Sequence, residues 1–190
     1  MALSEQEIIA KLGPLGALAG TWEGDKGIDE APGADRGLLT TPYRERAVFS
    51  AMQPIDNHEQ LLFGLRYSTT AWRIGETEPF HEELGYWLWD AARGEVMRCF
   101  MVPRGVTVLA GGRAKASDRR LMMSADVGSE TFSIASNPFL DIEFKTVRYE
   151  LDLEIESVGR FRYAEDTQLR MKGRPTIFHH RDSNRLTRVG

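Results

Sequence analysis

Alternation of apolar and charged residues is the dominant pattern of this chain. Its clearest example is Val147–Glu156, where every odd position is apolar and every even position is charged. Neighbouring side chains of a strand point to opposite faces, so this period of two predicts a β-strand with one face in a core or cavity and the other in water. A weaker alternation over 43–51 predicts another strand and turns Glu45 toward the apolar side.

Strand patterns recur along most of the chain. Further strands are predicted over 60–72, 80–90, 95–102, 105–112, 120–127, 131–135 and 160–172. Roughly ten short strands at a spacing of about 8–12 residues are typical of an all-β barrel or sandwich. Closure of a sheet removes its exposed edges, so we predict an antiparallel up-and-down barrel over about 18–189.

Two segments depart from the alternation. Ser4–Glu7 has the spacing of a capping box, and apolar residues follow at helical intervals, which predicts a short helix at about 4–12 against an end of the barrel. Residues 29–41 are rich in Gly, Pro and Asp and predict a long mobile loop that acts as a lid. No second helix is long enough for a βαβ unit, so we expect a single domain over 1–190.

Composition narrows the classes of partner. The net charge is −4 and the basic residues are scattered, so no basic stripe predicts a nucleic-acid partner. Neither a membrane-spanning run nor a signal peptide is apparent, which predicts no membrane partner and a cytoplasmic location. Cys99 is the only cysteine and fits a reducing compartment, where we interpret it as a buried small hydrophobe. A monomer and a homodimer both remain open.

The four histidines differ in context. His58 lies in a polar turn, and His81 precedes two glutamates without the spacing of a zinc motif, so neither is predicted to bind metal. His179 and His180 are adjacent on the last predicted strand, so one should face the interior. An interior imidazole can be the axial ligand of a haem iron. Pairing with a carboxylate such as Asp182 is the more common structural alternative.

The segment Gly20-Thr21-Trp22-Glu23-Gly24 places one large ring between two glycines at the head of the first strand. This suits a point where backbones crowd and a bulky ring plugs an end of a barrel. Barrel closure makes the first and last strands neighbours, so we predict that the guanidinium of Arg188 packs on the indole of Trp22.

Together with the segments Phe80–Trp87, Pro103–Val106 and Gln168–Pro175, this opening resembles the nitrobindin family over most of residues 15–189. The resemblance implies a ten-stranded calycin-like barrel, similar to fatty-acid-binding proteins and lipocalins. It also implies ferric haem b near the mouth, held by one histidine of a C-terminal strand. Reversible binding of nitric oxide and isomerisation of peroxynitrite to nitrate are the implied activities.

The resemblance also suggests which histidine binds the iron. The family's histidine follows a Gly-x-Pro by a few residues, and counting forward from Gly173–Pro175 places it on His179. Counting back from Leu186–Arg188 moves it past His180 to about Arg181, so His179 is favoured and His180 is kept as the alternative. The chain departs from the family at Val102, where members have a histidine, and over 29–35, where a family segment is replaced.

Two other functions fit the same barrel. One is a non-haem carrier or sensor of an apolar small molecule such as a fatty acid, whose carboxylate Arg66 or Arg98 could bind. The other is a structural or dimerisation module with a packed interior. Uptake of haem would distinguish the haem-binding function implied by the resemblance from these two alternatives.

Overall fold

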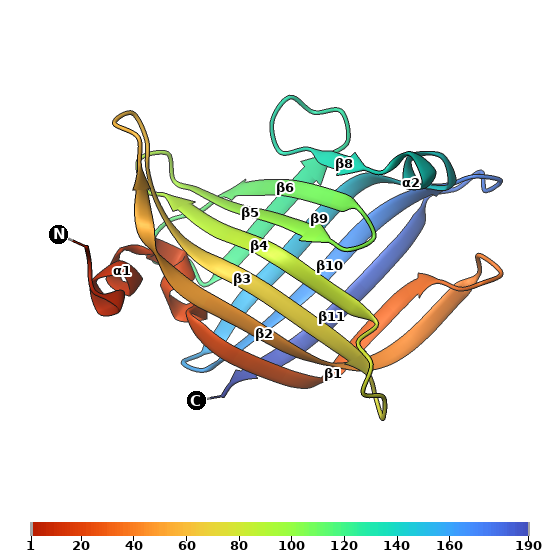
Figure 1. The fold of residues 1–190 in the computed structure, drawn as a ribbon, viewed down its shortest axis with the longest axis horizontal. Helices are drawn as coiled ribbons and strands as arrows, with labels where there is room; N and C mark the ends of the chain where they lie inside the picture. The colour runs from red at the N-terminus through yellow and green to blue at the C-terminus, as the bar shows by residue number, and fades with distance from the viewer. Residues whose placement is uncertain (1, 190) are drawn as a thin grey trace.

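Ten antiparallel strands close into a barrel in the computed structural model, which describes residues 2–189 (Figure 1). The barrel strands are β1 (Gly20–Pro32), β2 (Leu38–Asp56), β3 (Leu61–Arg73), β4 (His81–Asp90), β5 (Glu95–Val102), β6 (Val106–Arg113), β7 (Arg120–Asp126), β9 (Phe144–Ser157), β10 (Arg160–Met171) and β11 (Phe178–Arg188). Pairing runs from β1 to β7, continues through β9 and β10, and closes where β11 meets β1. A short strand, β8 (Ile134–Ser136), pairs with β6 only. The predicted fold class is confirmed.

A short helix covers one end of the barrel, as predicted. The helix α1 (Glu5–Lys11) begins after Ser4, and the Glu7 backbone N–H donates to Ser4 Oγ at 3.3 Å while the Ser4 backbone N–H donates to Glu7 Oε2 at 2.8 Å. A 3₁₀ helix, η1 (Gly13–Leu18), follows and buries Leu15 and Leu18. No helix within residues 2–189 combines the length and the apolar character needed to cross a membrane.

Trp22 plugs the covered end of the barrel. Its indole Nε1 donates to the Leu18 carbonyl at 2.7 Å, and its ring lies edge-on to Phe161 with centroids 4.8 Å apart. The Arg188 guanidinium carbon lies 4.5 Å from the indole centroid, and Trp22 and Arg188 are paired residues of β1 and β11. The predicted contact between these two side chains is confirmed.

The two glycines of the opening motif lie where the chain packs closely around Trp22. Gly20 has a φ of +129°, and a Cβ there would lie 2.4 Å from Arg188 Nη1. A Cβ on Gly24 would lie 2.5 Å from the Arg185 carbonyl oxygen. The backbone conformation of Gly20 therefore disfavours a side chain, and the carbonyl of β11 leaves no room for one at Gly24.

Two segments differ from expectation. The predicted long loop over 29–41 is wrong, because β1 extends to Pro32 and β2 begins at Leu38, leaving only 33–37 as the connection. Backbone pairing continues through the Gly- and Pro-rich residues because Pro32 stands at a strand end, where its missing N–H is tolerated. A second short helix, α2 (Pro138–Glu143), forms between β8 and β9, outside the predicted strands; the Leu140 backbone N–H donates to Asn137 Oδ1 at 3.0 Å.

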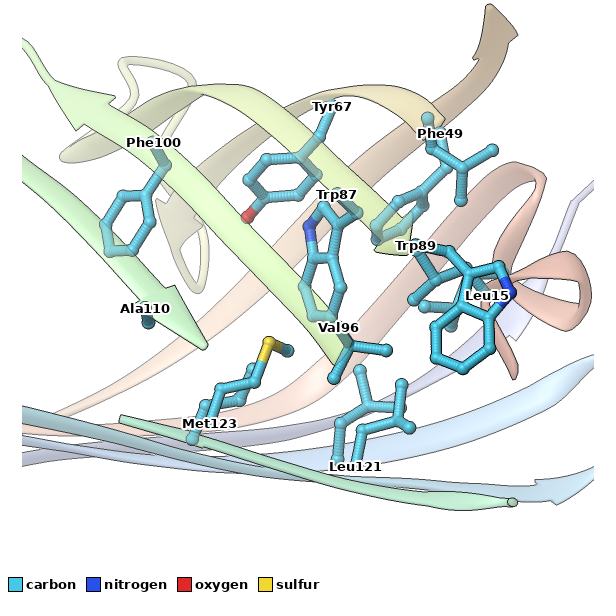
Figure 2. Close-up of a cluster of buried hydrophobic side chains, with 14 of the residues drawn as sticks. Leu15, Phe49, Tyr67, Trp87, Trp89, Val96, Phe100, Ala110, Leu121 and Met123 are labelled. Carbon is cyan, nitrogen blue, oxygen red and sulfur yellow. The ribbon is translucent and has the colours of Figure 1, made fainter. Parts of the chain in front are cut away.

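The apolar core occupies the half of the barrel next to α1. Figure 2 shows Trp87 and Trp89 pointing inward from β4 toward the cluster that contains Leu15, Val96, Leu121 and Met123. The alternate residues of the same strand, such as Tyr86, face outward. Cys99 also lies on the outer face of β5 and is half-buried rather than fully buried as interpreted.

Candidate functional site

The barrel encloses a cavity of about 840 Å³. Small-molecule sites commonly fall between about 300 and 1,000 Å³. In Figure 1, α1 covers one end, while the β1–β2 hairpin and α2 lie at the opposite end. Residues of that hairpin and of α2 line the cavity, so this end forms its mouth. An interior with this much space argues against a barrel that is packed shut.

The strand register places His180, not His179, in the cavity. His180 lines it from β11, and its Nε2 lies 2.7 Å from Asp29 Oδ1 on the neighbouring β1. His179 points outward with 42% of its side chain exposed and contacts Asp166 through Nδ1 at 2.7 Å. The expected inward orientation of His179 is therefore wrong, because Phe178, His180 and Asp182 share the inner face of β11.

His81 also faces the cavity, at the start of β4. Its Nε2 lies 3.2 Å from Glu83 Oε1, so this histidine is paired with a carboxylate. Burial opposes a charge on the imidazole, but the hydrogen bond and the charge of Glu83 raise the pKa of His81 overall. His58 occupies an exposed turn, as interpreted from the sequence.

A buried arginine organises the middle of the cavity. Arg98 is 2% exposed; its Nη2 donates to Glu83 Oε2 at 2.5 Å and to the Tyr67 hydroxyl at 3.0 Å, and its Nη1 donates to Glu165 and to the Tyr149 hydroxyl. Burial opposes ionisation of Glu83, but the Arg98 charge and the contact with His81 lower the pKa of Glu83 to about 2. Burial raises the pKa of Glu165 in spite of the same arginine.

A second buried carboxyl, Glu45, lies on β2 and confirms the orientation predicted for it. It accepts hydrogen bonds from the Thr69 hydroxyl at 2.8 Å, the Tyr163 hydroxyl at 2.7 Å and Asn184 Nδ2 at 3.1 Å. Burial raises the pKa of Glu45, and burial with the nearby carboxyls raises the pKa of Asp182 well above its usual range. We call Glu45, Glu83, Arg98, Glu165 and Asp182 the interior charged cluster.

Two arginines stand at the mouth. The guanidinium carbons of Arg36 and Arg104 lie 4.7 Å and 5.6 Å from the Phe144 ring centroid. Arg36 also donates to the Lys172 carbonyl and to Glu143 Oε2, both at 2.7 Å, so the tip of the β1–β2 hairpin is tied across the mouth. Val102 lines the cavity near this rim.

Neither Arg66 nor Arg98, the arginines considered as partners of a fatty acid, is well placed to bind its carboxylate. Arg66 is on the outer face of β3 and does not line the cavity. Arg98 is inside, but Glu83 and Glu165 already balance its charge. A further carboxylate would add negative charge to a region that already holds Glu45 and Asp182, so the middle of the cavity does not favour the carboxylate of a fatty acid.

Sequence reasoning turned Glu45 inward and named Arg98 as a possible carboxylate partner, but it missed Glu83, Glu165 and the ion pairs that Arg98 makes with them. Arg98 stands between the buried Val96 and Phe100 at the inward positions of β5, and Glu165 stands between Tyr163 and Thr167 on β10. A charge in the apolar phase of an alternating strand was the signal that could have found both residues.

A closed barrel with a histidine and two arginines at the mouth of its cavity defines a small-molecule-binding β-barrel protein. Residues 11–188 match the model of the THAP4-like, heme-binding beta-barrel domain, so the chain belongs to this family, and the nitrobindin resemblance of its motifs is confirmed. The structure is similar to the crystal structure of Rv2717c from M. tuberculosis, with a TM-score of 0.67 and 22% identity over 96% of this chain and 98% of that chain. At this identity the likeness shows the barrel fold alone. The comparison with curated proteins gives no match.

Proposed function

We propose that this protein binds haem b at the mouth of its barrel, with His180 as the iron ligand, and acts on nitric oxide or peroxynitrite. The supporting observation is the inward-facing imidazole of His180, held by Asp29 within a cavity of about 840 Å³. We also propose a cytoplasmic location, which the single cysteine of the sequence supports.

The donor set suits an iron porphyrin. A histidine that binds a metal through one ring nitrogen usually has a carboxylate or a carbonyl on the other, which fixes the ring. Asp29 contacts Nε2 of His180, and Nδ1 has no hydrogen-bond partner among residues 2–189, so one ring nitrogen remains available as a metal ligand. The apolar side chains of Val106, Leu140 and Phe144 line the cavity on the side of α2.

The rim supplies charges for the carboxylates of such a ligand. Arg104 forms no ion pair with a carboxylate among residues 2–189, whereas Arg36 already donates to the Lys172 carbonyl and to Glu143. Charge-assisted hydrogen bonds from guanidinium groups are strong and directional, so Arg104 is the candidate to bind a propionate.

The chain's own residues would hold and shield the group. Bound ferric haem would supply the metal centre for nitric oxide or peroxynitrite chemistry. His180 anchors the ligand, Asp29 orients His180, and the tethered hairpin at Arg36 limits entry of water. Val102 has no polar atom and donates no hydrogen bond to a molecule bound nearby.

The activity is tested on haem-loaded protein by mixing it with peroxynitrite and measuring the decay rate and the nitrate yield. We expect decay faster than with the same concentration of free haem, and formation of a ferric nitric-oxide complex in a separate absorbance titration. Loaded protein that neither accelerates the decay nor binds nitric oxide would contradict the proposed activity while leaving haem binding intact.

A further inference from the structure

Two hydrogen-bond donors in the cavity wall have no partner. Trp87 Nε1 and Arg98 Nε are both buried and unpaired, and the two residues are 2% exposed. They face each other directly across the β4–β5 pairing, and the Arg98 guanidinium carbon lies 5.3 Å from the Trp87 ring centroid. Both side chains line the cavity. A buried N–H group without a hydrogen-bond partner costs free energy, so a ligand that carries a hydrogen-bond acceptor would be stabilised here.

This spot lies toward the covered end of the barrel, because Trp87 belongs to the apolar cluster that contains Leu15 of η1. Trp87 follows His81 by six positions on β4, which at about 3.3 Å per residue is roughly 20 Å along the strand. The next inward residue, Trp89, already packs on η1 at the covered end, since a Cβ on Gly13 would lie 2.5 Å from its Nε1. Figure 2 shows the nitrogen of Trp87 on the side of its ring nearer to Tyr67 and Phe100 than to Trp89.

The surrounding charges select a neutral acceptor. Arg98 is balanced by Glu83 and Glu165, so it has no excess charge for an anion. A cation would meet two N–H donors, which repel it. A carbonyl oxygen has two lone pairs and no net charge, so it has the capacity to accept from two N–H donors without adding a charge to the cavity.

The aromatic side chains around the two donors favour an aromatic ligand. The rings of Tyr67 and Trp87 lie nearly edge-on with centroids 6.2 Å apart, and Phe49 lies 5.9 Å from Trp87. Phe100 and Tyr149 approach edge-on at 5.3 Å on the other side of Arg98. Walls of this kind favour a flat aromatic molecule by edge and offset contacts.

We propose that the inner half of the cavity is a binding site for a small, neutral aryl carbonyl compound, whose oxygen accepts hydrogen bonds from Trp87 Nε1 and Arg98 Nε. The site goes beyond the proposed haem function and does not depend on it.

The test is a calorimetric titration of the haem-free protein with acetophenone and three analogues of similar size. α-Methylstyrene replaces the carbonyl oxygen with a methylene group, benzoate is an anion, and benzylamine is a cation. We expect acetophenone to bind about tenfold more tightly than each analogue. If α-methylstyrene binds as tightly as acetophenone, the two donors do not contribute to the affinity. Tighter binding of benzoate or benzylamine would overturn the assignment of a neutral ligand. No binding of acetophenone would mean that the two donors are simply hydrated.

Variants locate the site. Trp87→Phe keeps an aromatic ring but removes the N–H together with part of the indole, so its effect is compared for acetophenone and α-methylstyrene. It should weaken acetophenone about tenfold and α-methylstyrene much less, whereas Trp72→Phe, on the outer wall, should leave the affinity unchanged. An unchanged affinity in Trp87→Phe would contradict the proposal. His180→Ala should bind acetophenone as the wild type does, so failure of the haem proposal and failure of this one give different results.

Discussion

At the scale of single residues, Arg98 is the side chain on which the interior charges depend most. It contacts Glu83 and Glu165 inside the barrel, where both carboxyl groups are largely buried. A buried ion pair adds little net stability, but removing one partner leaves a buried charge uncompensated and is costly.

We therefore expect Arg98→Met to lower the free energy of unfolding by about 3–5 kcal/mol at pH 7. The pKa of Glu83 is about 2 in the folded protein against an ordinary value of 4.5, so its stabilisation is complete above 4.5 and is lost as the pH falls toward 2. The difference in the free energy of unfolding between Arg98→Met and the wild type should therefore become smaller as the pH falls from 4.5 toward 2. Urea unfolding at several pH values measures it, with Arg66→Met on the outer wall as the control. A difference independent of pH would contradict the role given to Glu83.

Trp22 is the residue on which closure of the covered end depends. It is fully buried, and its ring contacts Phe161 and the Arg188 guanidinium. Trp22→Ala should cost about 3–5 kcal/mol of folding free energy because it leaves a large cavity. Trp72→Ala removes the same atoms from the outer face, where Arg44 stacks on the ring, and should cost roughly 1 kcal/mol. Similar melting temperatures for both variants would show that Trp22 is not a plug.

At the scale of elements, alternation identified most strands because each carries one face toward the interior and one toward water. Val147–Glu156 lies within β9, and the capping box at Ser4 lies at the start of α1. Alternation cannot locate the end of a strand that continues through Gly and Pro, which is why the 29–41 segment was mistaken for a loop. The pairing of β1 with β2 supplies the missing information.

The choice between His179 and His180 shows the same limit. Counting forward from Gly173–Pro175 crosses the β10–β11 turn, where side chains do not alternate. Counting back in steps of two from the buried Leu186 reaches Asn184, Asp182 and His180, all on the inner face. The register of a strand is therefore best counted from its own buried residues.

The β1–β2 hairpin is tied across the mouth of the cavity. Arg36 ties its tip to Lys172 and Glu143, and hydrogen bonds from a charged donor are worth about 1.5–3 kcal/mol. Arg36→Ala should therefore open the mouth and raise the dissociation rate of bound haem by about tenfold. Transfer of haem to excess apomyoglobin measures this rate, with Arg44→Ala as the control. An unchanged rate would mean that the tether does not gate the cavity.

At the scale of the whole molecule, the barrel has one covered end and one open end. The helix α1 and Trp22 close the first, and the second carries His180 and two arginines around the mouth. The sequence predicted this architecture, and the family to which the chain belongs is consistent with a haem site at the mouth. The interior charged cluster gives this member a polar middle layer that lies between the mouth and the apolar core.

The most direct test of the account is a haem titration of the purified protein, followed by the Soret absorbance, for the wild type and for His180→Ala and His179→Ala. We expect the wild type and His179→Ala to bind one equivalent of haem with the same ferric spectrum, since His179 lies outside the barrel. His180→Ala should lose that spectrum while keeping its melting temperature near that of the wild type. Absence of a Soret shift in the wild type, or retention of the same spectrum in His180→Ala, would contradict the assignment of His180 as the haem ligand.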